Sequence, residues 1–271
     1  MYAIISDIHG NLEALTTVLK DISDREITEI VCLGDVIGYG PNPKECIDLV
    51  QKSCRVCLMG NHDHAVLYEP CNFNTAAERA CYWTRSVLEA EADAAARNRR
   101  WEFLGKMRVR VREDDVLYVH ASPRRPINEY IFPEDVFTNP QKVMANFERL
   151  DARVCFVGHT HQPGVFLDDP YFDPPHELPD SPFYEIEEQR TIINVGSVGQ
   201  PRDKDRRASY VVVHTLDRGD GKGSLVSAAL ECSIEQVEFV RLEYDVETTV
   251  NKVLAEPELD DLLGHRLYEG R

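Results

Sequence analysis

Residues 153–161 read RVCFVGHTH, an apolar run that ends in a glycine followed by two histidines two residues apart. The run favours a short buried strand, because its residues are β-branched, aromatic or otherwise apolar. A neutral imidazole can bind a metal ion or carry a proton, yet two histidines in a loop can also be simply solvated. The motif leaves both interpretations open until it is compared with the rest of the chain.

Four further apolar runs have the same character. They are YAIIS (2–6), EIVCLG (29–34), RVCLMG (55–60) and VLYVH (116–120). Helix-like segments separate the runs; between the first two, Leu15, Val18 and Ile22 recur at helical spacing. This alternation predicts an α/β fold with crossover connections, in which ligands gather beyond the carboxyl ends of the strands.

Polar clusters begin where each of the five predicted strands ends. They are Asp7 with His9, then Asp35, then Asn61 with His62 and Asp63, then His120, and last His159 with His161. Each cluster alone is ordinary turn chemistry. In a mainly parallel sheet, however, all five would meet at one rim, and their joint occurrence predicts a metal site.

The types of ligand narrow the chemistry. Carboxylate, imidazole and amide oxygen suit manganese, iron or zinc, and no cysteine follows these strands. An aspartate such as Asp35 can bridge two cations, and two cations about 3.5 to 4 Å apart are the arrangement that clamps a transferring phosphoryl group. The residues thus predict a dinuclear hydrolase.

The motifs DxH, GD, GNHD, H and GHTH, in this order, resemble the calcineurin-like metallophosphoesterases. Outside them, GDVIGYGPNP, HASPRRP, INVGSVGQPRD and YDVETTVNKVL resemble a bacterial branch of small phosphoesterases. The resemblance runs nearly end to end. It implies a two-sheet αββα sandwich that forms a single domain over residues 1–271.

The resemblance also implies a role for each residue. One metal would be held by Asp7, His9, Asp35 and His161, and the other by Asp35, Asn61, His120 and His159. A hydroxide that bridges two transition-metal ions, manganese first and iron or zinc as alternatives, would attack phosphorus. His62 would be the catalytic residue that donates a proton to the leaving group.

Two positions depart from the protein-phosphatase branch of this family. That branch has an aspartate and an arginine where this chain has Gly38 and Tyr39. Asp63 is the candidate to orient His62 in place of the missing aspartate. Charge next to the phosphate would have to come from Arg124, Arg125 or Arg202. Without an arginine at position 39, we expect phosphodiesters to be better substrates than phosphomonoesters.

Composition sets limits on partners and location. The formal charge of −17 disfavours high-affinity, nonspecific binding of nucleic acid, whereas a local metal charge still permits a small phosphorylated substrate. No apolar stretch approaches the ~20 residues that span a bilayer, and Met1 leads directly into a strand-like run. Eight scattered cysteines fit reduced thiols. We expect a cytoplasmic protein without a membrane segment.

The second half of the chain adds a proline-rich, acidic segment and further strands. Residues 168–190 are predicted to form a loop or lid, which either shapes the substrate pocket or covers a sheet edge. Strands are predicted in 191–199 and 208–216 and as a pair within 225–244, with a closing helix at 246–256.

The sequence therefore predicts a metal-dependent phosphoesterase that hydrolyses phosphodiesters or small phosphorylated metabolites. Alternatives of the same kind are a protein Ser/Thr phosphatase and a dinucleoside polyphosphate hydrolase. A noncatalytic binding scaffold on the same fold is the alternative from another class, and the complete ligand set with His62 argues against it. The physiological substrate, the native metal and the oligomeric state stay open.

Overall fold

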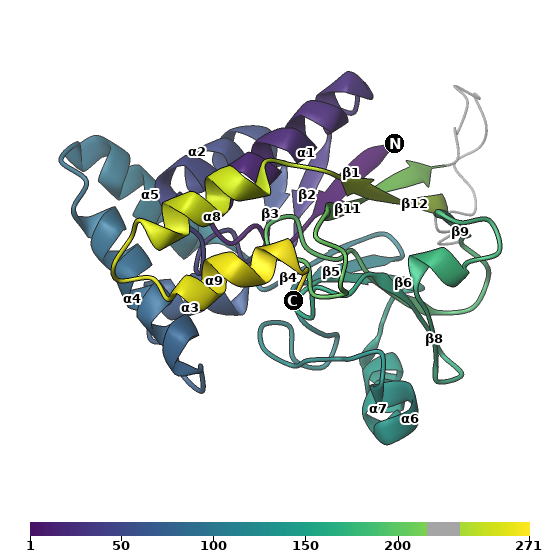
Figure 1. The fold of residues 1–271 in the computed structure, drawn as a ribbon. Helices are drawn as coiled ribbons and strands as arrows, with labels where there is room; N and C mark the ends of the chain where they lie inside the picture. The colour runs from purple at the N-terminus through teal and green to yellow at the C-terminus, as the bar shows by residue number, and fades with distance from the viewer. Residues whose placement is uncertain (216–233) are drawn as a thin grey trace.

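The computed structural model describes residues 1–215 and 234–271, whose strands form two six-stranded sheets (Figure 1). The first sheet has the order β3 (Val56–Cys57), β2 (Ile30–Cys32), β1 (Tyr2–Ile5), β11 (Ala208–Thr215), β12 (Ile234–Leu242) and β9 (Phe183–Glu185). The second has the order β4 (Arg110–Glu113), β5 (Val116–Val119), β6 (Val154–Val157), β10 (Thr191–Asn194), β7 (Gly164–Leu167) and β8 (Tyr171–Asp173).

Helices connect the strands and cover the outer faces of the sheets. Those in the first half are α1 (Leu12–Asp24), α2 (Pro43–Ser53), α3 (Asn61–Leu67), α4 (Thr75–Glu89) and α5 (Ala94–Lys106). Those in the second half are α6 (Asp135–Thr138), α7 (Pro140–Arg149), α8 (Val246–Leu254) and α9 (Asp261–His265), with short 3₁₀ turns at Pro175–Glu177 and Arg266–Tyr268. No helix in these described ranges is both long enough and apolar enough to cross a bilayer.

All five predicted strands exist, but they belong to two sheets rather than one. β1, β2 and β3 are parallel neighbours in the first sheet, and β5 and β6 are parallel neighbours in the second. The premise of one mainly parallel sheet, used to bring the strand ends together, is therefore wrong, whereas the two sheets implied by the family resemblance are present. Between β3 and β5 the chain runs through α3, α4 and α5 and enters the second sheet through the antiparallel β4–β5 pair.

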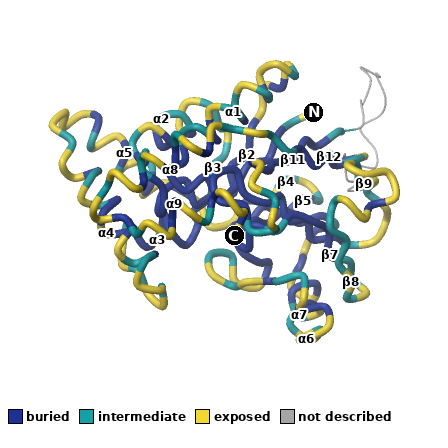
Figure 2. Tube along the Cα trace, in the orientation of Figure 1, coloured by how far each residue is buried: buried dark blue, intermediate teal, exposed yellow. Residues whose placement is uncertain are grey.

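Two apolar faces hold the sheets together. Ile4 and Val31 of the first sheet belong to the same buried cluster as Phe156 and Ile193 of the second. Figure 2 shows this buried core running through the middle of the molecule. Since the sheets face each other, the carboxyl ends of their parallel strands can still contribute to one site.

Helices bury the outer faces of both sheets. Leu15 of α1 and Ile47 of α2 pack in the cluster that contains Ile5 and Cys32 of the first sheet. On the second sheet, Phe147 of α7 packs with strand residues of β5, β6 and β10. The layers are thus helix, sheet, sheet, helix, and the predicted αββα sandwich is confirmed.

The proline-rich segment 168–190 contains two short strands, so the prediction of a loop was only partly right. β8 pairs with β7 at the edge of the second sheet, and β9 pairs with β12 at the edge of the first. Edge positions tolerate the neighbouring prolines, because one side of an edge strand needs no partner. The segment joins the edges of the two sheets.

The remaining predicted elements are mostly present. β10 lies within 191–199 but ends at Asn194, β11 occupies 208–215, and α8 forms the closing helix. β12 is one strand of the pair predicted within 225–244. The other strand of that pair falls on residues outside the described ranges.

Phe156 tests the packing between the sheets. Its ring is fully buried and stacks on Tyr118 with ring centroids 5.9 Å apart. We expect Phe156→Ala to lower the free energy of unfolding by about 3 to 5 kcal/mol, through lost burial and a residual cavity. Urea denaturation measures this, with Phe137→Ala as the control, since that ring is 82% exposed and should change stability by less than about 0.5 kcal/mol. Equal effects of the two substitutions would contradict the conclusion that Phe156 stabilises the packing between the two sheets.

Candidate metal centre

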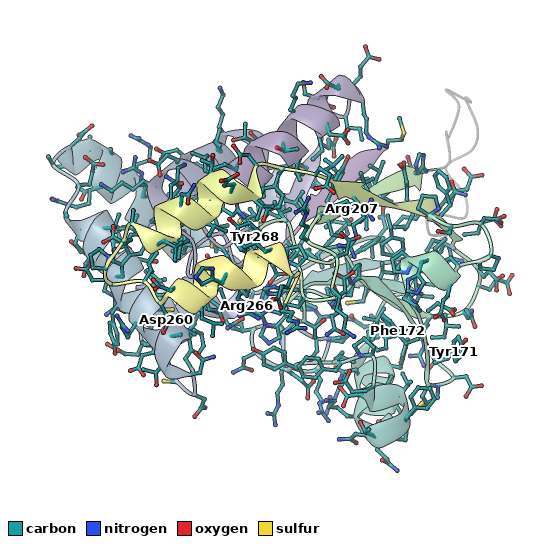
Figure 3. All side chains as sticks on the ribbon, in the orientation of Figure 1. Tyr171, Phe172, Arg207, Asp260, Arg266 and Tyr268 are labelled. Atoms are coloured by element: carbon teal, nitrogen blue, oxygen red, sulfur yellow. The ribbon has the colours of Figure 1, made fainter. Side chains whose placement is uncertain are left out.

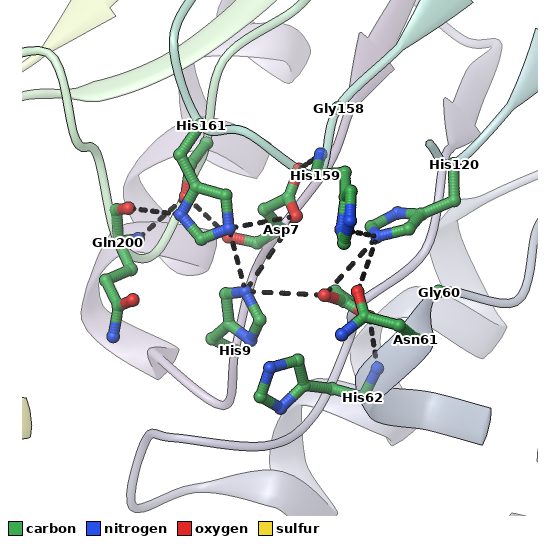
Figure 4. Close-up of polar contacts among 12 residues, drawn as sticks. Asp7, His9, Gly60, Asn61, His62, His120, Gly158, His159, His161 and Gln200 are labelled. Atoms are coloured by element: carbon green, nitrogen blue, oxygen red, sulfur yellow. Dashed lines mark hydrogen bonds and ion pairs between the residues drawn. The ribbon is translucent and has the colours of Figure 1, made fainter. Parts of the chain in front are cut away.

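The structure brings all seven predicted metal ligands into one buried cluster between the two sheets (Figure 4). They are Asp7, His9, Asp35, Asn61, His120, His159 and His161. Each follows the carboxyl end of β1, β2, β3, β5 or β6. The strand-end prediction of where these residues meet is therefore correct, even though the strands belong to two sheets.

The two carboxylates use one oxygen to hold a loop and direct the other into the cluster. Asp7 Oδ2 accepts the backbone N–H of His159 at 3.0 Å, and Asp35 Oδ1 accepts that of His62 at 2.8 Å. Asp7 Oδ1 lies 3.1 Å from His161 Nε2, and Asp35 Oδ2 lies 3.4 Å from His120 Nε2. Each carboxylate is thus fixed in place with one oxygen free to bind a cation.

Two histidines have their tautomer fixed by carbonyl groups. His161 Nδ1 lies 2.5 Å from the carbonyl oxygen of Gln200, and His120 Nδ1 lies 3.2 Å from that of Leu33. A carbonyl oxygen only accepts hydrogen bonds, so Nδ1 carries the proton in both rings. The Nε2 lone pairs then face the cluster, as in histidines that bind metal through Nε2.

The cluster contains overlapping groups of side chains that could hold a metal ion. Asp7, His9 and His161 have their ligand atoms within 4.8 Å of one another, and so do His9, Asp35 and His62, and Asp35, His120 and His159. Asn61 joins the last of these groups, since its Oδ1 lies 3.2 Å from His120 Nε2.

A buried oxygen without a partner supports this fit. Asp7 Oδ1 faces His161 in the cluster and accepts no hydrogen bond within the described part of the chain. Buried polar atoms are normally satisfied, and an oxygen and nitrogen set of this kind suits a borderline transition metal. The residues present therefore fit a metal ion chemically.

Charge in the cluster is also suited to cations. Burial by itself raises the pKa of Asp7, but His161 and His120 outweigh it and leave the pKa well below its ordinary value. Burial lowers the pKa of His120, whereas Asp35 and Asp7 outweigh that effect and raise it to about 9, so without a metal ion Nε2 carries a proton that a cation would have to displace before using the lone pair. Burial lowers the pKa of His9, His159 and His161, so neutral imidazoles lie next to ionised carboxylates, which is the electrostatic environment of a metal site.

The backbone at the cluster is strained, and glycines make the close approaches possible. The angle φ is positive at five of the seven predicted ligands, namely Asp7, His9, Asp35, His159 and His161. A Cβ on Gly60 would lie 2.0 Å from Asp35 Oδ1, and a Cβ on Gly158 would lie 2.3 Å from Asp7 Oδ2. The glycines of GNHD and GHTH are therefore needed for contact between loops, and strain of this kind gathers at functional sites.

The hydrogen bonds of Asp63 go to the backbone of the loop after β2 and of the start of α3. Its Oδ2 accepts the backbone N–H groups of Asp35 and Gly60, and its Oδ1 accepts those of Val36 and Ile37. All four bonds go to backbone, and none goes to the His62 ring. Asp63 fixes the loop after β2 against the start of α3 and acts on the site by holding Asp35.

His62 lies at the edge of the cluster, among aromatic rings. Its ring centroid is 4.3 Å from Tyr39, 4.7 Å from Phe73 and 4.8 Å from His9. Its Nδ1 contacts Cys81 Sγ at 3.6 Å. The side chain is next to the predicted ligands and is held by packing, a position from which a proton can be delivered to a group bound in the cluster.

Of the three candidate arginines, Arg202 lies beside Tyr39, with its Cζ 5.7 Å from the centroid of the ring. Arg125 lines a cavity that the predicted ligand Asn61 also lines. Arg124 is instead paired with Glu129. Arg202 thus supplies a positive charge next to Tyr39, where the protein-phosphatase branch has an arginine at the position of Tyr39 itself.

Sequence reasoning missed several residues that support the cluster. Asn194 Nδ2 donates to the carbonyl oxygen of Gly158 at 2.7 Å, and Ser197 Oγ donates to that of Asp7 at 2.8 Å. Asn194 and Ser197 lie in the segment INVGSVGQPRD, whose resemblance to bacterial small phosphoesterases was the only indication of their importance. Tyr130 stacks on His159 with ring centroids 3.8 Å apart, and nothing in the sequence near Tyr130 marked it.

Comparisons with known proteins place the chain in a family. Residues 1–218 match the calcineurin-like phosphoesterase superfamily domain. An uncharacterized protein of Methanocaldococcus jannaschii, MJ0912, is 36% identical over 281 aligned positions, which cover 100% of this chain and 98% of that protein. The solved metallophosphoesterase of Sphaerobacter thermophilus has a TM-score of 0.77 and 34% identity, over 100% of this chain and 98% of the other.

The chain therefore belongs to the calcineurin-like phosphoesterase superfamily. This family and the geometry of the cluster support a general phosphoesterase function.

Asp35 belongs to two of the overlapping groups of candidate ligands, and its loss should affect both. We expect manganese-reconstituted wild type to hold two ions, Asp35→Ala to hold fewer than one, and His9→Ala to retain about one, since the family resemblance places His9 at one metal of a two-metal arrangement. Elemental analysis after gel filtration measures the ratio. If Asp35→Ala retained two ions, the hypothesis that Asp35 bridges the two metal ions would be wrong.

Asp63 should control the site without binding metal. We expect Asp63→Ala to lower the free energy of unfolding by more than about 3 kcal/mol and to weaken manganese binding, because four buried N–H groups lose their acceptor. Asp63→Asn, which keeps one acceptor oxygen, should be less severe. Denaturation and metal titration of both variants check this, and unchanged stability would contradict the role.

Proposed function

We propose that the protein is a cytoplasmic, metal-dependent phosphoesterase that hydrolyses phosphodiesters or small phosphorylated metabolites. The observation that carries the proposal is the single buried cluster of seven oxygen and nitrogen ligands arranged around Asp35. We assign Asp7, His9, Asp35 and His161 to one cation. Asp35 would be shared with a second cation held by Asn61, His120 and His159.

Two divalent cations in these positions supply Lewis acidity toward a phosphoryl oxygen and make water a better nucleophile near neutral pH. Manganese is the first candidate, with iron or zinc as alternatives, because the ligands are carboxylates, imidazoles and one amide. The chain's own residues have two tasks. They hold the substrate phosphate in the cluster and deliver a proton to the leaving group.

His62 is the residue proposed to deliver that proton. Burial lowers the pKa of His62 to about 4, although the Asp35 carboxylate opposes the shift, so the ring is mainly neutral near pH 7. An anionic phosphate bound next to the ring favours its protonated form. The packing of the ring against Tyr39 and Phe73 keeps it oriented toward the cluster.

The preference for diesters over monoesters has lost its main support. It was expected because Tyr39 replaces the arginine of the protein-phosphatase branch. Arg202 lies over the Tyr39 ring, and a guanidinium at this place can bind a dianionic phosphate as well. We therefore extend the proposal to small phosphoesters of either charge, and leave phosphoproteins as the less favoured substrate.

The direct test is turnover of nitrophenyl phosphate and bis-nitrophenyl phosphate by manganese-loaded protein. We propose that both are hydrolysed, that a chelator abolishes hydrolysis and that added manganese restores it. Absence of turnover with both esters and with alkyl phosphates, in protein shown to contain two ions, would favour the noncatalytic scaffold.

His62→Ala should separate proton donation from metal binding. We expect the variant to keep both ions and to lose kcat by about 10² to 10⁴-fold for an alkyl leaving group, as is typical of general-acid catalysis. The loss should be much smaller for nitrophenolate, which departs without a proton. The test is to measure kcat with both leaving groups and the metal content of the variant. An equal loss of kcat for both leaving groups, or loss of metal, would show that His62 is not the proton donor.

A further inference from the structure

A cavity of about 290 Å³ lies beside the candidate metal centre, at the start of α3. Asn61, one of the seven predicted metal ligands, is part of its lining. Phe73 also lines the cavity and packs against the His62 ring, with ring centroids 4.7 Å apart. The cavity is therefore next to both the predicted ligands and the residue proposed to donate the proton.

Two other cavities near the centre are less suited to the organic group of an ester. A space of about 10 Å³ lined by His9 and Tyr39 holds no more than a water molecule. A cavity of about 860 Å³ has Phe172 and Arg207, both labelled in Figure 3, in its lining, and among the described residues none of the seven predicted ligands lines it. The cavity at Asn61 combines contact with the cluster and room for a ligand.

The walls of the cavity at Asn61 combine apolar surface with a few polar groups. The apolar part is supplied by Ala65, Phe73, Pro126 and Ile127, and the polar part includes His64 and Asn128. Such a mixture is typical of a small-molecule pocket, where apolar walls hold a ring or chain and polar groups orient it. The volume is at the lower end for such pockets, which favours a small organic group over a peptide segment.

The charges in the lining favour an uncharged group. Glu69 and Arg125 both line the cavity, so it carries one carboxylate and one guanidinium. The Glu69 carboxylate accepts a hydrogen bond from the Tyr82 hydroxyl at 3.0 Å and lies 3.7 Å from an Arg85 nitrogen. Because the cavity shows no excess of either sign, charge complementarity does not select a second anion.

The wall around Pro126 is anchored to the metal centre. The carbonyl oxygen of Pro126 accepts the N–H of Ala121 at 2.8 Å, directly after the predicted ligand His120. On the same loop, Ser122 Oγ donates to Glu129 Oε2 at 2.7 Å. A wall that is already held in place loses little conformational freedom when a ligand binds, so it suits recognition of a small group.

We propose that this cavity binds the leaving alcohol of the substrate, a small uncharged group that carries a ring or a short apolar chain. The inference rests on the proposed function, which places the phosphate at the seven-residue cluster and the proton donor at His62. Since Phe73 contacts the His62 ring and lines the cavity, an alcohol in the cavity lies on the side of the proton donor. The cavity then selects among phosphoesters by the size and polarity of the alcohol.

Benzylphosphonate and methylphosphonate test the pocket, because they differ by an aromatic ring and have no ester bond to hydrolyse. Calorimetry is done on the manganese-loaded full chain at constant free manganese. We expect wild type to bind benzylphosphonate about tenfold more tightly than methylphosphonate, since the ring is buried in the cavity. Ile127→Trp fills the cavity and should weaken benzylphosphonate by about tenfold, while methylphosphonate changes by less than about threefold.

His176→Trp is the matched control. It adds the same side chain to the wall of the larger cavity, at a position whose side chain is 80% exposed. Both affinities should stay within about threefold of wild type. Asn128→Trp, at an exposed position in the wall of the proposed pocket, takes the place of Ile127→Trp if that variant does not fold.

Three outcomes would overturn the inference. They are equal affinity of wild type for the two phosphonates, a selective loss in His176→Trp but not in Ile127→Trp, and equal weakening of both phosphonates by Ile127→Trp and Asn128→Trp. Turnover of the nitrophenyl esters is measured separately. A selective loss of benzylphosphonate binding in a protein without turnover would support the pocket while the proposed function fails, and turnover without discrimination between the phosphonates would do the reverse.

Discussion

Four backbone N–H groups converge on the Asp63 carboxylate, and the shape of the candidate metal centre depends on them. They come from Gly60, Asp35, Val36 and Ile37, so one side chain ties the loop after β2 to the start of α3. Asp35 is held in a left-handed conformation by this contact and directs its free oxygen into the cluster. Four hydrogen bonds to one side chain offset the strain that an unsupported loop would relieve by moving.

The convergence of the seven candidate ligands could be predicted because the signal is local. Each ligand follows its own apolar strand within a few residues, as Asp7 follows β1 and His159 follows β6. The two-sheet sandwich was predicted only from the family resemblance, because the local pattern of each strand does not show which other strands it pairs with. The backbone partners of Asp63 could not be predicted for a similar reason, because positions 35 to 37 are distant from it in sequence.

Arg202 and Tyr130 show the same limit on the substrate side. Both lie beside the site in segments that no strand-end motif marks, Arg202 over the Tyr39 ring and Tyr130 over that of His159. The overall charge of −17 gave no sign of a local excess of positive charge beside the site. Net charge affects how a protein attracts or repels charged molecules at long range. Specificity for a ligand depends instead on a few charged side chains at the site.

The most direct measurement of the central proposal is anomalous diffraction from crystals of the manganese-loaded protein. Two peaks are expected, both next to Asp35, one also next to Asp7 and His161 and the other next to Asn61 and His120, in keeping with a two-metal site. A single peak in fully loaded protein, or peaks that leave Asp35 uncoordinated, would contradict the dinuclear centre.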